Sequence, residues 1–163
     1  SVTRPGQYHA HGGSPNGNIG TGPGVVVGAW AANGKPCLLF TGDGSFGFYP
    51  MELETMARLG IPVVVVISNN SAWGMISMSE VYVRPSEIEQ KGQSNTTLPH
   101  MVAYEKMAGM FGGHGEKVTD PEQILPAIKR AAANGKPSIV NVEVDDVSLS
   151  PFIAGYAAQI KPS

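Results

Sequence analysis

The side chains of this sequence best suited to chemistry are an aspartate between two glycines and a pair of asparagines. The first group is Gly42-Asp43-Gly44-Ser45, and the second, Asn69-Asn70, follows one predicted helix and one predicted strand later. A carboxylate and a carboxamide oxygen are hard ligands that suit Mg²⁺, which takes phosphate oxygens for much of its remaining coordination. The two glycines allow the backbone to approach such a phosphate closely, and Ser45 adds a hydroxyl.

The elements around these groups are expected to bring them to one edge of a sheet. Residues 37–42 predict a buried strand that ends at Gly42, residues 50–60 predict a helix, and the β-branched run at 61–69 predicts a central strand. A helical crossover makes consecutive strands parallel, so both polar loops open at the same edge. Asp43 and Asn70 are therefore expected to lie close together.

The rest of the chain continues this alternation of helices and strands. Helices are predicted over 24–34, 100–113 and 120–135, and strands over 116–118 and 137–145. Residues 77–99 are polar and contain prolines, which favours an exposed loop or a mobile lid. The pattern predicts a doubly wound α/β fold with a mainly parallel sheet and helices on both faces, which binds ligands at the carboxyl ends of its strands.

Composition limits the classes of function. The chain has 163 residues, of which 42% are hydrophobic, so one domain spanning 1–163 is expected. Charged residues make up 15% and the net charge is -2, which leaves no basic stripe for a nucleic-acid partner. No apolar run approaches the roughly 20 residues of a membrane span. The single Cys37 cannot form an internal disulfide, so we expect a cytoplasmic protein with a buried structural thiol.

The succession of GDGS, helix, β-branched strand and NN resembles the diphosphate-and-metal motif of thiamine-diphosphate enzymes, and the continuation NNSAWGM at 69–75 is similar too. The resemblance covers nearly the whole chain and corresponds to the C-terminal diphosphate-binding domain of acetolactate synthase-, benzaldehyde lyase- and 2-hydroxyacyl-CoA lyase-like enzymes. It implies the thiamine-diphosphate-binding fold. It also implies an enzyme that makes or breaks a C–C bond beside a carbonyl by carboligation, lyase chemistry or 2-oxo acid decarboxylation.

The resemblance also implies roles for individual residues. Asp43, Asn70 and the Ala72 carbonyl would hold Mg²⁺. In the segment GNIG, the Gly17 carbonyl would bind the aminopyrimidine, and Ile19 would force the cofactor into its folded V shape. The full set of implied cofactor-binding residues is Gly17, Asn18, Ile19, Gly42, Gly44, Ser45, Asn70, Gly74 and Met75.

No catalytic residue is assigned to this chain. The family's activating glutamate is expected on a pyrimidine-binding domain of the same or another chain, and Glu52 and Glu54 are interpreted as a helix-terminal charge and a solvated or interfacial carboxylate. The chain would then be a fragment of a longer polypeptide or one subunit of a split enzyme, inactive alone and part of a homo-oligomer. Its substrate would be a small 2-oxo acid, an aldehyde or an acyl-CoA, and any FAD would bind an absent middle domain.

Two other interpretations apply to the same residues. A non-catalytic diphosphate- and metal-binding module, or a subunit of a split 2-oxo acid decarboxylase, stays open, although the intact Asp43 and Asn70 favour an enzyme. A dinucleotide-binding fingerprint in GNIGTGPG fails because Val25 stands where that motif needs glycine or alanine, and because no strand precedes it.

Overall fold

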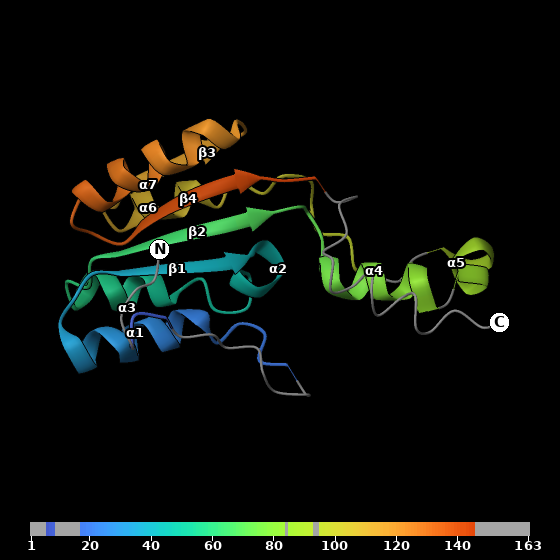
Figure 1. Ribbon diagram of the computed structural model, residues 1–163, viewed down its shortest axis with the longest axis horizontal. Helices are drawn as coiled ribbons and strands as arrows, with labels where there is room; N and C mark the ends of the chain where they lie inside the picture. Colours follow the sequence, from blue (N-terminus) through green and yellow to red (C-terminus); the bar gives the residue numbers. More distant parts are fainter. Residues whose placement is uncertain (1–5, 9–16, 84, 93–94, 146–163) are drawn as a thin grey trace.

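The computed structural model describes residues 6–8, 17–83, 85–92 and 95–145. Within these residues, four parallel strands form one sheet in the order β1-β2-β4-β3 (Figure 1). The parallel α/β architecture confirms the predicted fold class. The strands are β1 (Cys37–Gly42), β2 (Val63–Asn69), β3 (Gly115–Val118) and β4 (Ser138–Glu143).

Helices cover both faces of this sheet, as predicted. The helices α1, α3 and α6 pack on one face, and α7 packs on the other. In the view of Figure 1, α1 and α3 lie below β1, and α7 lies above β4. The helical elements are α1 (Gly22–Asn33), α2 (Asp43–Phe46), α3 (Glu52–Arg58), α4 (Gly74–Val83), α5 (Pro85–Lys91), α6 (Glu105–Met110), the 3₁₀ turn η1 (Pro121–Gln123) and α7 (Ile124–Ala133). None of the described helices is long and apolar enough to span a bilayer.

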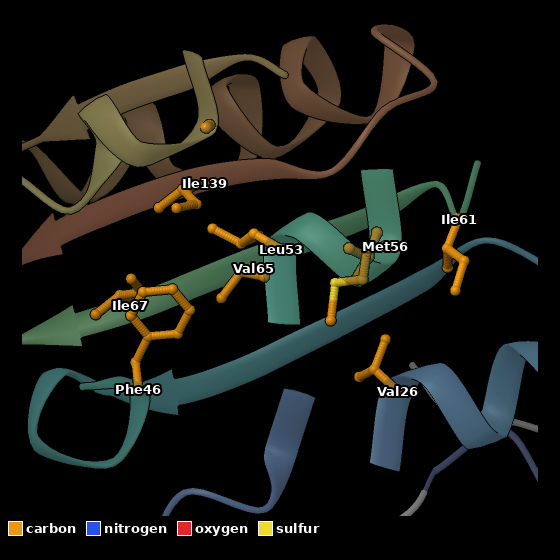
Figure 2. Close-up of a cluster of buried hydrophobic side chains, with 10 residues drawn as sticks. Val26, Phe46, Leu53, Met56, Ile61, Val65, Ile67 and Ile139 are labelled. Atoms are coloured by element: carbon orange, nitrogen blue, oxygen red, sulfur yellow. The ribbon is translucent and has the colours of Figure 1, made fainter. Parts of the chain in front are cut away.

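The strand β2 forms the centre of the hydrophobic core. Val63, Val65 and Ile67 face α1, α3 and α6, whereas Val64 and Val66 face α7, and all five side chains are buried. Figure 2 shows the first of these two clusters, in which Phe46 and Ile139 pack around β2. A run of β-branched residues in the middle of the sheet is the expected result of burial on both faces. The prediction for this strand is confirmed.

The strand β1 is covered on one face only, and its residues there are partly buried, so the prediction of a buried strand is wrong. Leu38 is 58% exposed and Phe40 is 72% exposed. These residues pair in register with Val64 and Val66, so they point to the α7 side of the sheet. Because β1 lies at the edge of the described sheet and α7 packs on β2, β3 and β4, Leu38 and Phe40 stay uncovered. Cys37, at the start of β1, is half-buried, and this burial raises the pKa of its thiol.

The segment predicted as a loop over 77–99 contains helical structure instead. The helices α4 and α5 project from the carboxyl end of the sheet (Figure 1). The α5 helix has no buried residue, and Met75, Ile76 and Val81 of α4 are exposed. Because these helices bury no apolar face in the core, their sequence lacks the helical period of apolar residues that would predict them. The movement of this segment as a lid stays a prediction.

Other helices begin or end at residues that differ from those predicted. The helix α6 begins at Glu105 rather than at residue 100, because Met101 has a left-handed backbone (φ 45°) that a helix cannot include. The helix α3 begins at Glu52, two residues after Pro50.

Candidate functional site

Asp43 occupies the first position after β1, at the carboxyl end of the sheet. It is only 2% exposed, and its Oδ2 atom is buried without a hydrogen-bond partner among the described residues. Burial raises the pKa of this carboxyl above its usual value, and the backbone N–H groups of Gly44, Asp43, Ala72 and Asn70 oppose the shift. A buried carboxylate with one unsatisfied oxygen is costly in water-free surroundings, and a cation would relieve that cost.

Asn70 follows the last residue of β2 and faces Asp43 across the edge of the sheet. The inward-pointing atom of its carboxamide lies 3.2 Å from Asp43 Oδ1 and 3.0 Å from the carbonyl oxygen of Ala72. If that atom is the amide oxygen, three oxygens meet with no hydrogen between them. If the amide is turned over, its Nδ2 donates to both of the others. The structure therefore brings together the three residues predicted to hold a metal.

The donor set at this point fits a small hard cation. It consists of one carboxylate, one carboxamide and one backbone carbonyl, which are the oxygen ligands that Mg²⁺ takes from proteins. With its oxygen inward, the Asn70 carboxamide places Nδ2 over Gly74, where an added Cβ would come within 2.7 Å of that atom. A larger residue at position 74 would push the Asn70 side chain away from Asp43.

The loop after Asp43 is joined to the glycine-rich segment that precedes α1. The Gly20 amide donates to Ser45 Oγ at 3.0 Å, which links the segment GNIG to the Asp43 loop. At Gly44, an added Cβ would lie 2.6 Å from Trp73 Cδ1, so this glycine allows Trp73 to pack against the loop. The ring of Trp73 also packs on Phe48, with 5.5 Å between the ring centroids. These contacts bring the predicted diphosphate-binding residues Gly44 and Ser45 next to the ring of Trp73 and to Gly20.

A family model described as "Thiamine pyrophosphate enzyme, C-terminal TPP binding domain" matches residues 1–142 of the chain. The chain belongs to this family. Its curated relatives include the acetolactate synthase large subunit IlvG of Mycobacterium tuberculosis, which is 37% identical over 132 residues, or 80% of this chain and 23% of the relative. Others are oxalyl-CoA decarboxylase of Escherichia coli K12, 32% identical over 149 residues (90% and 24%), and 2-hydroxyacyl-CoA lyase of Oryza sativa subsp. japonica, 33% identical over 134 residues (79% and 22%). The chain spans about a quarter of the length of these relatives.

The remaining predicted cofactor residues of this TPP-binding domain lie in two places. Residues 17–19 precede α1, and Gly74 and Met75 begin α4. Ile19 is 51% exposed, so it is not part of the core, as the sequence interpretation required. Gly17 has a left-handed backbone (φ 63°), and the Asn18 carbonyl accepts from Thr21 Oγ1 at 2.9 Å. Met75 is exposed at the start of α4. The roles given to these residues by resemblance stay predictions.

Glu54, the second of the two helix-borne glutamates, lies on the surface of the TPP-binding domain. It forms an ion pair with Arg58 one helical turn later, with 2.9 Å between Arg58 Nε and Glu54 Oε1. Both side chains are about half exposed, so the pair contributes little to stability. The interpretation of Glu54 as a solvated or interfacial carboxylate stays a prediction, which its exposure and its pairing with Arg58 support.

Sequence reasoning missed the polar residues behind the Asn70 loop. Asn69 and Asn141 are buried, at 1% and 3% exposure, and their carboxamides bond to each other. The signal for Asn141 was present, because it is the one polar residue within the apolar run 139–142 of the last predicted strand.

Asn70 and Ala72 also line a cavity of about 500 Å³ between α4 and residues 97–101.

Proposed function

We propose that this domain binds thiamine diphosphate together with Mg²⁺, and that its enzyme makes or breaks a C–C bond beside a carbonyl. The observation that carries the proposal is the convergence of the Asp43 carboxylate, the Asn70 carboxamide and the Ala72 carbonyl, next to the unsatisfied Asp43 Oδ2. Membership of the TPP-binding family supports the cofactor. The oxygen donor set supports the cation.

The residues of this chain would hold and orient the cofactor. Asp43, Asn70 and the Ala72 carbonyl would hold Mg²⁺, and the backbone of Gly44 with the Ser45 hydroxyl would bind the diphosphate. The Gly17 carbonyl would bind the aminopyrimidine, and Ile19 would hold the cofactor in its folded V shape. When bound, thiamine diphosphate would act as an electron sink that stabilises negative charge on a former carbonyl carbon.

A second domain would complete the site. Large apolar side chains are exposed around the Asp43 loop, which supports contact with a pyrimidine-binding domain that carries the activating glutamate; they are Ile19, Phe48, Tyr49, Trp73 and Met75. That domain would belong to the same or another chain of a cytoplasmic homo-oligomer, and any FAD would bind a further domain.

The substrate class is proposed from the relatives' names. An acetolactate synthase, an oxalyl-CoA decarboxylase and a 2-hydroxyacyl-CoA lyase all resemble this chain to a similar degree. These names support a small 2-oxo acid, an aldehyde or an acyl-CoA as substrate.

Calorimetry with thiamine diphosphate, in the presence and absence of Mg²⁺, tests the proposal on this chain. We expect Mg²⁺-dependent binding that Asp43→Ala abolishes and that Glu54→Ala retains, since Glu54 is a surface carboxylate paired with Arg58. Unchanged affinity in Asp43→Ala would refute the ligand assignment. With pyruvate added, we expect no turnover from the chain alone, and brisk turnover would refute the assignment of the activating glutamate to another domain.

A further inference from the structure

The loop that carries Asn70 and Ala72 contains a backbone turn that serine rarely adopts. Ser71 has φ 57°, in the left-handed region. This turn sends the Ala72 carbonyl back toward Asp43, and the Ser71 amide donates to Asn69 Oδ1 at 3.1 Å. The direction of both Asn70 and Ala72 therefore depends on how the Asn69 side chain is held.

A fully satisfied hydrogen-bond network holds the Asn69 carboxamide. Its Nδ2 donates to Asn141 Oδ1 and to the Val102 carbonyl, each at 3.1 Å. Asn141 Nδ2 in turn donates to Val102 O at 3.1 Å and to Glu105 Oε2 at 2.7 Å. Every amide hydrogen of the two buried asparagines has an acceptor, so each carboxamide has only one satisfied orientation.

The network joins three elements that come from distant parts of the sequence. Asn69 ends β2, Asn141 lies in β4, and Glu105 begins α6, which packs on this face of the sheet. An apolar side chain at position 141 would match its neighbours Ile139 and Val140 and would avoid burying a carboxamide. The cost of burying these polar groups has an explanation, because the network selects a single conformation of the loop at residues 70–72.

We propose that Asn141 and Glu105 are positioning residues that act through Asn69 to set the turn at Ser71, and so aim Asn70 and Ala72 at the cation. This inference rests on the proposed function, because it assumes that those residues hold a metal. Glu105 fixes the orientation of Asn141, Asn141 fixes Asn69, and the Asn69 oxygen fixes the Ser71 amide. None of the three would itself be a ligand of the cation.

Other contacts keep the loop folded when the network is removed. Ser71 O accepts from the Leu98 amide at 2.7 Å, and Ser71 Oγ accepts from the Met101 amide at 2.8 Å. Ala72 also forms an isolated antiparallel bridge with Thr97. Loss of Glu105 is therefore expected to loosen the aim of the ligands rather than to unfold the domain.

The test is an electron paramagnetic resonance titration of this chain with Mn²⁺ in the presence of thiamine diphosphate. Outer-shell partners of metal ligands typically contribute about 10- to 100-fold in metal affinity, so we expect Glu105→Ala and Asn141→Leu to raise the Mn²⁺ Kd by about that factor. Glu105→Gln keeps an acceptor for Asn141 Nδ2 and should bind Mn²⁺ like the wild type. Glu116→Gln, a change of the same type at the far edge of the sheet, is the control.

Each outcome of the titration decides a different point. A wild-type chain that binds no Mn²⁺ would overturn the proposed function and the positioning role with it. A wild type that binds, with an unchanged Kd in folded Glu105→Ala, would overturn the positioning role alone. Equal loss in Glu105→Gln and Glu105→Ala would also overturn it, because the charge rather than the hydrogen bond would then matter. If Asn141→Leu does not fold, the Glu105 pair still decides the question.

Discussion

The buried carboxylate of Asp43 is expected to make the cation-free domain less stable than an otherwise identical domain with asparagine at this position. Burial raises the Asp43 pKa above its ordinary value of 3.8. Stability from a group with a raised folded-state pKa is fully present below the ordinary pKa and is lost as the pH rises through the folded-state pKa. At neutral pH the ionised side chain therefore opposes folding, and Asp43→Asn should stabilise the cation-free domain.

The size of the effect follows from the unsatisfied Asp43 Oδ2. A buried acceptor without a partner costs about 1–3 kcal/mol. An asparagine with its Nδ2 at the position of Asp43 Oδ1 could donate to the Asn70 oxygen, and its remaining oxygen would carry no charge and so would cost less to bury. For a domain of this size, each kcal/mol shifts Tm by about 2–4 °C, so we expect Asp43→Asn to raise Tm by about 2–12 °C in EDTA. A cation at 100 times its Kd would stabilise the wild type by about 2.7 kcal/mol and the variant by much less, which closes or reverses the gap.

Differential scanning calorimetry at pH 7 measures the Tm of the wild type and of Asp43→Asn, first in EDTA and then in Mg²⁺ with thiamine diphosphate. The EDTA gap should also shrink as the pH falls toward 3.8, because the wild-type carboxyl then takes up its proton. Glu54→Gln provides the matched control, since that carboxylate is exposed and paired with Arg58. A variant less stable than the wild type in EDTA at pH 7, or equal stabilisation of both by the cation, would refute the reasoning.

Three further predictions concern residues away from the cation cluster. Glu116 is bonded to Arg130 and has a pKa lowered to about 2, so its stabilisation is present above the ordinary value of 4.5 and is lost as the pH falls through about 2. Glu116→Gln should therefore lower Tm at pH 7, and calorimetry should show that this difference shrinks as the pH falls from 4.5 to 2. At Gly113, an added Cβ would lie 1.7 Å from the Pro137 carbonyl oxygen, so Gly113→Ala should destabilise by more than about 3 kcal/mol in urea unfolding, and a small change would disprove the clash. Phe40→Ser should change urea stability by less than about 0.5 kcal/mol because Phe40 is 72% exposed, and a large loss would mean that Phe40 is covered in solution.

The sequence predicted those features that follow from residues within one element or from the order of the elements. The β-branched run of β2 indicated burial on both faces, because only a central strand tolerates apolar residues at every position. An aspartate before a proline, as in Asp120-Pro121, is typical of a helix start, and the Asp120 Oδ1 accepts from the Glu122 amide at 2.9 Å at the start of η1, which continues into α7. The convergence of Asp43 and Asn70 followed from the rule that parallel strands share one carboxyl edge.

Other features could not be predicted because they depend on neighbours that the local pattern does not contain. Leu38 and Phe40 have the same apolar character as the buried residues of β2, and only the position of β1 at the edge of the described sheet leaves them exposed. The helices α4 and α5 project from the sheet, so burial imposes no helical period on their sequence. The hydrogen-bond acceptors of the Asn69 amide could not be predicted either, because Asn141 lies in β4 and the Val102 carbonyl precedes α6, both far away in the sequence.

The two neighbouring asparagines show how one motif can contain two different kinds of function. Side chains alternate between the faces of a strand, so Asn69 points to the same face as Val65 and Ile67, where α6 packs. There its carboxamide meets Asn141 and is unable to reach a cation. Asn70 lies beyond the strand, and the turn at Ser71 leaves it free to face Asp43. A pair is therefore needed because the first asparagine fixes the turn that the second one requires, and spacing alone does not separate these roles.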